Sequence, residues 1–122
     1  MRKALMNALA VSALSAMLVT TGLLFTPVMA ADDSVEQGRK IAFDRKLGNC
    51  LACHMIQGGA LPGNIGPPLV AMKARFPDKG QLRAQVWDAT VKNPNSLMPP
   101  FGKHAVLSER ELDLVVEFIY SL

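Results

Sequence analysis

The sequence predicts a single all-α domain, because it holds two helix-capping patterns, one long apolar stripe and no alternating strand pattern. The clearest helix is expected after Ser108, since Ser108 and Glu111 have the spacing of a capping box. Asp113 and Glu117 lie on its polar side, and its apolar residues recur at helical spacing: Leu112, Val115, Val116, Ile119 and Leu122. We therefore expect a C-terminal helix with one buried face.

The other helices are predicted from a second capping pattern and from periodicity. Ser34 and Gln37 fit a capping box that would start a helix ending near Gly48. A short helix is expected over residues 69–75 and a longer one over residues 79–92. The first helix would turn three apolar residues toward the core: Val35, Ile41 and Phe43.

Two segments rich in glycine and proline separate these helices. Residues 57–69 contain four glycines and three prolines, which excludes a regular helix. Residues 93–102 form a second irregular segment, in which Pro99 and Pro100 directly follow Met98. Both segments are expected to be shaped loops.

The first thirty residues are typical of a secretory signal peptide. Two basic residues precede an apolar run over residues 4–25, and small or apolar residues follow at positions 27–30. We expect cleavage after Ala30, which leaves residues 31–122 as one domain. The alternative is an uncleaved membrane anchor, because the run approaches the ~20 apolar residues of a spanning helix.

The remaining segment carries eleven Lys and Arg against ten Asp and Glu, so its net charge is close to zero. It has no clustered basic stripe, which excludes the usual nucleic-acid binders. A domain of this size often depends on a metal, disulfide or cofactor for stability. We therefore expect no nucleic-acid partner and, after cleavage, no membrane association.

The strongest chemical signal is a pair of cysteines followed by a histidine. Cys50 and Cys53 are separated by two residues, and His54 follows directly. This spacing fits covalent haem c, in which each cysteine adds to a vinyl group and the histidine ligates the iron. A redox dithiol would sit in a βαβ unit, which the sequence lacks, and a zinc site would need His104 as fourth ligand. The sequence predicts one covalent haem c.

Two further residues are expected to complete this site. The carbonyl of Pro67 would accept a hydrogen bond from the His54 ring and fix its tautomer. Met98 would be the sixth iron ligand, because the prolines after it hold its loop extended. Two other residues remain alternative sixth ligands, His104 and Met72, whereas Met55 adjoins His54 and is expected to stay on the proximal side.

With these motifs, residues 38–122 resemble the SoxX family, the small c-type cytochrome subunit of the SoxAX complex of bacterial sulfur oxidation. The haem motif alone would indicate only a cytochrome, whereas the two loops are narrower signals. The resemblance rests on five segments: residues 48–54, 61–69, 87–90, 93–94 and 98–102.

The resemblance implies a class I cytochrome c fold, with the haem packed between the N-terminal and C-terminal helices and the two Gly/Pro-rich loops. It also implies a periplasmic location and ligation by His54 and Met98. The implied partners are a larger cytochrome, SoxA, and indirectly the carrier SoxYZ and a small cytochrome acceptor. In that family the complex joins thiosulfate to a carrier cysteine as an L-cysteine S-thiosulfotransferase, and SoxA holds the active-site haem.

The residues agree with a role in electron transfer. A haem with both axial positions filled by protein leaves no open position for substrate. Cys50 and Cys53 would both be used in thioethers, so no catalytic residue is expected on this chain. Two alternatives stay open: an independent soluble electron shuttle to an oxidase or peroxidase, and a ligand-binding or enzymatic haem with an open sixth position.

Overall fold

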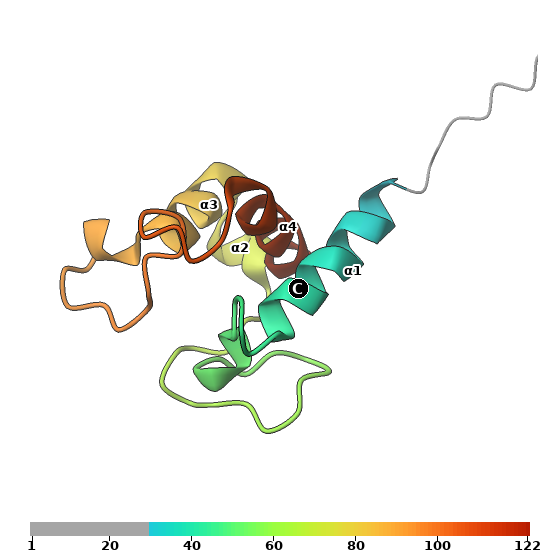
Figure 1. The fold of residues 1–122 in the computed structure, drawn as a ribbon, viewed down its shortest axis with the longest axis horizontal. Coiled ribbons are helices and arrows are strands. Elements are labelled where there is room, and N and C mark those ends of the chain that lie inside the picture. The colour runs from blue at the N-terminus through green and yellow to red at the C-terminus, as the bar shows by residue number, and fades with distance from the viewer. Residues whose placement is uncertain (1–29) are drawn as a thin grey trace, which may run out of the picture.

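The computed structural model describes residues 30–122, and within this range all regular elements are helical (Figure 1). The predicted signal peptide, apart from Ala30, lies outside the described residues. Within residues 30–122, no helix combines the length and the apolar character needed to cross a membrane. The elements are four α-helices, α1 (Ala30–Phe43), α2 (Met72–Arg75), α3 (Lys79–Trp87) and α4 (Glu109–Tyr120), and two 3-10 turns, η1 (Cys50–Ala52) and η2 (Ala89–Val91).

The helices α1 and α4 cross at close range and form the main contact of the fold (Figure 1). Gly38 lies at the crossing, where an added Cβ would collide with the Leu114 carbonyl and the Phe118 side chain. Beside it, the rings of Phe43 and Phe118 meet edge to face, with centroids 5.7 Å apart. The absence of a side chain at Gly38 therefore allows the two backbones to touch.

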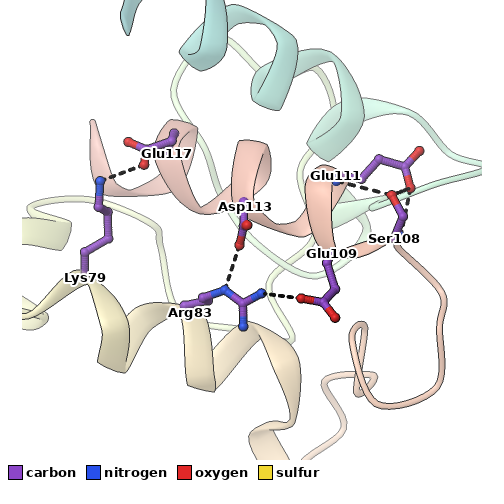
Figure 2. Close-up of polar contacts among 7 residues, drawn as sticks. All are labelled: Lys79, Arg83, Ser108, Glu109, Glu111, Asp113 and Glu117. Atoms are coloured by element: carbon purple, nitrogen blue, oxygen red, sulfur yellow. Dashed lines mark hydrogen bonds and ion pairs between the residues drawn. The ribbon is translucent and has the colours of Figure 1, made fainter.

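The helix α4 has the start and the buried face that the sequence predicts. The Ser108 hydroxyl accepts the Glu111 amide at 3.3 Å, and the Glu111 carboxylate accepts the Ser108 amide at 2.9 Å (Figure 2). The capping box is therefore confirmed. The buried residues of the helix are Leu112, Val115, Val116, Phe118 and Ile119.

Ion pairs connect the polar side of α4 to α3 (Figure 2). Lys79 lies 2.6 Å from Glu117, and Arg83 lies 2.7 Å from Asp113 and 3.4 Å from Glu109. Exposed pairs of this kind contribute about 0–1 kcal/mol each. Their effect is mainly to fix the orientation of α3 on α4, whose apolar faces meet beneath them.

The predicted start of the first helix is wrong. Ser34 lies inside α1, which already includes Ala30, so it does not cap the helix. Gln37 donates its side-chain amide to the Asp33 carboxylate at 2.8 Å, one turn earlier. The sequence matches a capping pattern, but this hydrogen bond from Gln37 to Asp33, four residues earlier, supports a helix that continues through Ser34.

The predicted ends of two helices also differ from the structure. The first helix ends at Phe43 and not near Gly48, because the Asp44 carbonyl accepts the Leu47 and Asn49 amides in a turn. The helix predicted over residues 79–92 ends at Trp87. There the backbone of Asp88 becomes extended, and η2 follows.

The short helix predicted over residues 69–75 covers only Met72–Arg75. Ala71, just before it, adopts a left-handed conformation with φ of 50°, which a continuous helix cannot contain. Leu69 is buried as part of the core, although it lies outside the helix.

We predict that Gly38→Ala destabilises the domain by about 1–3 kcal/mol, because the added methyl group must push the α1 and α4 backbones apart. The free energy of unfolding of the haem-loaded protein in denaturant measures this. Lys40→Ala, on the exposed side of the same helix, should change it by about 0.5 kcal/mol or less. Equal effects of the two variants would contradict the close crossing.

Candidate functional site

A cavity of about 760 Å³ opens between η1, the two Gly/Pro-rich loops and the core faces of the helices. This volume lies within the usual range of cofactor pockets, roughly 300–1,000 Å³. Cys50, Cys53, His54 and Met98 all contribute to its wall. Its apolar lining comes from core residues of α2, α3 and α4: Met72, Leu82, Val86, Val115 and Ile119.

The two cysteines and the histidine are presented by one tight turn. Asn49 adopts a left-handed conformation, with φ of 47°, and begins η1. The Cys50 carbonyl then accepts the amides of Cys53 at 3.2 Å and of His54 at 2.9 Å. This winding brings both thiols and the imidazole to the same cavity.

The thiols of Cys50 and Cys53 are not joined in a disulfide. Burial raises the pKa of the Cys50 thiol to about 11. Reactive dithiols need a thiol whose pKa is lowered, so this environment disfavours the redox-dithiol alternative. A zinc site would need His104 beside Cys50, Cys53 and His54, and His104 is exposed and does not belong to the described cavity wall.

The imidazole of His54 is fixed by the first Gly/Pro-rich loop. Its Nδ1 lies 2.7 Å from the Pro67 carbonyl oxygen, the contact that the sequence analysis expects of this carbonyl. A carbonyl can only accept, so Nδ1 is the protonated nitrogen and Nε2 keeps its lone pair for a metal. The arrangement fits an axial ligand whose tautomer is set by the protein.

Gly66 has a role that sequence reasoning missed. Its amide donates to the Cys53 carbonyl at 2.8 Å, and its α-carbon lies against the His54 ring, where any Cβ would collide with the ring atoms. The signal in the sequence was a glycine directly before the residue expected to bind His54. The contact became visible only once the loop was folded back onto η1.

A cation of α2 also supports this loop. The Arg75 guanidinium donates to the Pro68 carbonyl at 2.8 Å and contacts the Met72 sulfur at 3.4 Å. Among the described residues that line the cavity, the charged side chains are those of Arg45 and Arg75. Both are positive, so the cavity favours an anionic group.

The structure separates the candidates for the sixth ligand. Met98 is half-buried in the second loop and lines the cavity, and its amide donates to the Ser96 hydroxyl at 3.2 Å. Met72 also lines the cavity, but it is 2% exposed and its sulfur is already engaged by Arg75. His104 and Met55 are exposed and do not belong to the described cavity wall. This geometry favours Met98.

Comparison with known proteins identifies the fold. The family described as "Cytochrome C oxidase, cbb3-type, subunit III" matches residues 33–119. The crystal structure of SoxXA from P. pantotrophus contains a chain that is 28% identical, with a TM-score of 0.64 over 70% of this chain and 79% of that chain. The comparison with curated protein sequences gives no match. The class I cytochrome c fold and the resemblance to SoxX are therefore confirmed.

The residues of the cavity fit haem c, the cofactor that a cytochrome c domain implies. Two thiols lie beside a histidine of fixed tautomer, and a thioether belongs to the same wall. The apolar lining suits a porphyrin, and Arg45 and Arg75 suit its propionates. The two thioether bonds and the two axial ligands stay predictions.

We predict that Gly66→Ala weakens the seating of His54, because the added methyl group would occupy the space of the imidazole ring. The expected result is a loss of about 1–3 kcal/mol in the free energy of unfolding and an altered absorption spectrum of the haem-loaded protein. Asn64→Ala, at an exposed position of the same loop, should leave both unchanged. A wild-type spectrum and stability in Gly66→Ala would show that the ring does not depend on this contact.

Proposed function

Because this chain belongs to the cytochrome c family described as "Cytochrome C oxidase, cbb3-type, subunit III", we propose that it is a monohaem cytochrome acting as the electron-accepting subunit of a SoxAX-like complex. In this proposal Cys50 and Cys53 bond one haem c, and His54 and Met98 ligate its iron. The observation that carries it is the shared cavity, whose wall holds all four of these residues.

Haem c, when bound, supplies a one-electron couple. The chain's own residues set the conditions for that couple. His54 is oriented by Pro67 and Gly66, so the proximal ligand has little freedom to move between redox states. Met98 would hold the sixth position against small molecules, and the buried apolar lining would limit access of water. Such a site transfers electrons without binding substrate.

The rim of the cavity supports contact with a protein partner. Ile65, Leu97 and Val106 line the cavity, and their exposed fractions are 65%, 81% and 45%. Large apolar side chains gathered at the mouth of a site are typical of interaction surfaces. We assign this rim to a larger SoxA-like cytochrome, because exposed apolar residues that also line the cavity would let a partner approach a bound cofactor.

The reaction proposed for the complex releases electrons, and the proposed role of this chain is to accept them. Joining thiosulfate to a carrier cysteine forms one S–S bond and releases two electrons and the thiol proton. This chain would take one electron at a time and pass it to a small cytochrome between turns. The carrier would meet the partner subunit, since no thiol of this chain stays free. The leader predicted at residues 1–30 would place the complex in the periplasm.

A second candidate function is an independent electron shuttle to an oxidase or peroxidase. This second function is supported by the description of the matched family, which names an oxidase subunit. The two functions differ in whether the chain forms a lasting complex with a second, larger haem protein.

The first experiment tests the ligation on which electron transfer depends. We predict that the oxidised wild-type protein shows a weak sulfur-to-iron band in the far red and that Met98→Ala abolishes it. The reduced wild type should not bind carbon monoxide at neutral pH, whereas Met98→Ala should. The haem should stay on the chain in denaturant if both thioethers are present.

Met72→Leu and His104→Ala are the matched controls, and both should keep the far-red band. If the wild type lacks this band and its reduced form binds carbon monoxide, the electron-transfer proposal is wrong. The haem would then have a ligand-binding or enzymatic role. Loss of the band in Met72→Leu alone would assign the sixth ligand to α2.

The second experiment tests the partner. We predict that Leu97→Glu weakens association with the larger cytochrome of the native periplasmic fraction by about tenfold or more, because a charge would enter an apolar interface. Val91→Glu, at an exposed apolar residue outside the cavity rim, should have little effect. Purification of the wild type as a lone monomer, with thiosulfate oxidation unchanged after deletion, would favour the independent shuttle.

A further inference from the structure

Asp88 is a buried carboxylate at the end of α3, and the haem site as described makes no use of it. Asp88 is 5% exposed, and among the residues that the structure describes it is the one buried residue with a charged side chain. A buried carboxylate is costly unless both oxygens are paired. The Lys103 ammonium and the Thr90 hydroxyl lower the pKa of Asp88 to about 2, so the group is ionised near neutral pH.

The two carboxylate oxygens of Asp88 bind different segments. Oδ1 accepts hydrogen bonds from the Thr90 amide, at 3.0 Å, and from the Thr90 hydroxyl. Through the bond to the amide, the Asp88 side chain caps η2. The second Gly/Pro-rich loop, residues 93–102, is the Met98 loop. It begins directly after this turn, where the Asn93 amide donates to the Ala89 carbonyl at 3.1 Å. One oxygen therefore fixes the segment that leads into the loop.

The other oxygen fixes the segment that leads out of the loop. Oδ2 accepts the Lys103 ammonium at 2.8 Å, and Lys103 follows Met98 by five positions. The amides of Gly102 and Lys103 also donate to the Trp87 carbonyl, at 3.2 and 3.3 Å. Gly102 lies against the Trp87 ring so closely that a Cβ would collide with it. The returning end is thus anchored on Trp87 and Asp88 together.

We propose that Asp88 and Lys103 form a positioning pair, which closes the Met98 loop at both ends and holds the Met98 thioether at the cavity. The inference rests on the proposed ligation by Met98. Holding a thioether on a loop at a fixed place costs conformational entropy, and this cost is larger when the ends of the loop are free to separate. Anchoring both ends to one carboxylate removes most of that freedom before the ligand bond forms.

The pairing makes an ordered prediction for three variants of the haem-loaded full chain. Lys103→Met keeps the aliphatic stem but leaves the buried Asp88 carboxylate without its cation and Oδ2 without a donor, so it should be the most harmful. Asp88→Asn keeps an oxygen for Thr90 and buries no charge, so its effect should be smaller. The double variant Asp88→Asn with Lys103→Met should recover the level of Asp88→Asn, since it no longer buries a lone carboxylate.

Two readouts report on Met98 rather than on the fold. In Lys103→Met we expect a weaker far-red band and carbon monoxide binding to the reduced protein, which the wild type should not show. Lys79→Met removes a cation from the exposed pair with Glu117 and should change neither readout. A lower unfolding temperature in Lys103→Met, with an unchanged band and unchanged carbon monoxide binding, would overturn the positioning role.

Hydrogen exchange separates this inference from the proposed function. If the pair closes the loop, the amides of residues 96–104 should exchange faster in Lys103→Met than in wild type and Lys79→Met. A wild type without the far-red band would refute ligation by Met98, while faster exchange in Lys103→Met would still support closure of the loop. Unchanged exchange would refute the closure itself, whichever residue binds the iron.

Discussion

The close crossing of α1 and α4 at Gly38 is the constraint on which the rest of the structure depends. It joins α1, at the start of the described chain, to α4, near its end. After α1, a turn over residues 44–49 leads into η1, which contains Cys50, and Cys53 and His54 follow it directly. The helix α4 supplies Val115 and Ile119 to the cavity lining. The position of the haem motif relative to the apolar cavity lining therefore depends on the contact between the backbones of α1 and α4.

The two Gly/Pro-rich loops perform equivalent tasks on the two sides of the cavity. The first is folded back on η1, so that Pro67 and Gly66 hold the imidazole from its edge and its face. The second is tied at its ends to Trp87 and Asp88 and presents Met98. In both loops a backbone carbonyl and a closely packed glycine fix the segment, because irregular segments have no regular hydrogen-bond ladder to support them. The Asp88 carboxylate adds an ion pair in the second loop.

Residue patterns predicted the parts of the fold that depend on local chemistry. The capping box at Ser108 is local, and so is the turn that presents His54. The same kind of pattern failed at Ser34, because a hydrogen bond from Gln37 to Asp33 lets α1 continue. The contacts of Gly66 with His54 and of Asp88 with Lys103 escaped notice because these partners lie far along the chain, where no spacing rule predicts a contact. The comparisons confirm the cytochrome c fold, whereas the axial ligands rest on cavity geometry.

The first loop also divides into a held part and a free part. The Gly63 amide donates to the Leu51 carbonyl at 2.7 Å, and the Gly59 amide donates to the Ile56 carbonyl at 3.1 Å. Between these two ties, Leu61 is 92% exposed. Strain from a longer tip would be absorbed before it reached Pro67. Residues 60–62 can therefore be lengthened or given new surface features while the His54 ring keeps its place.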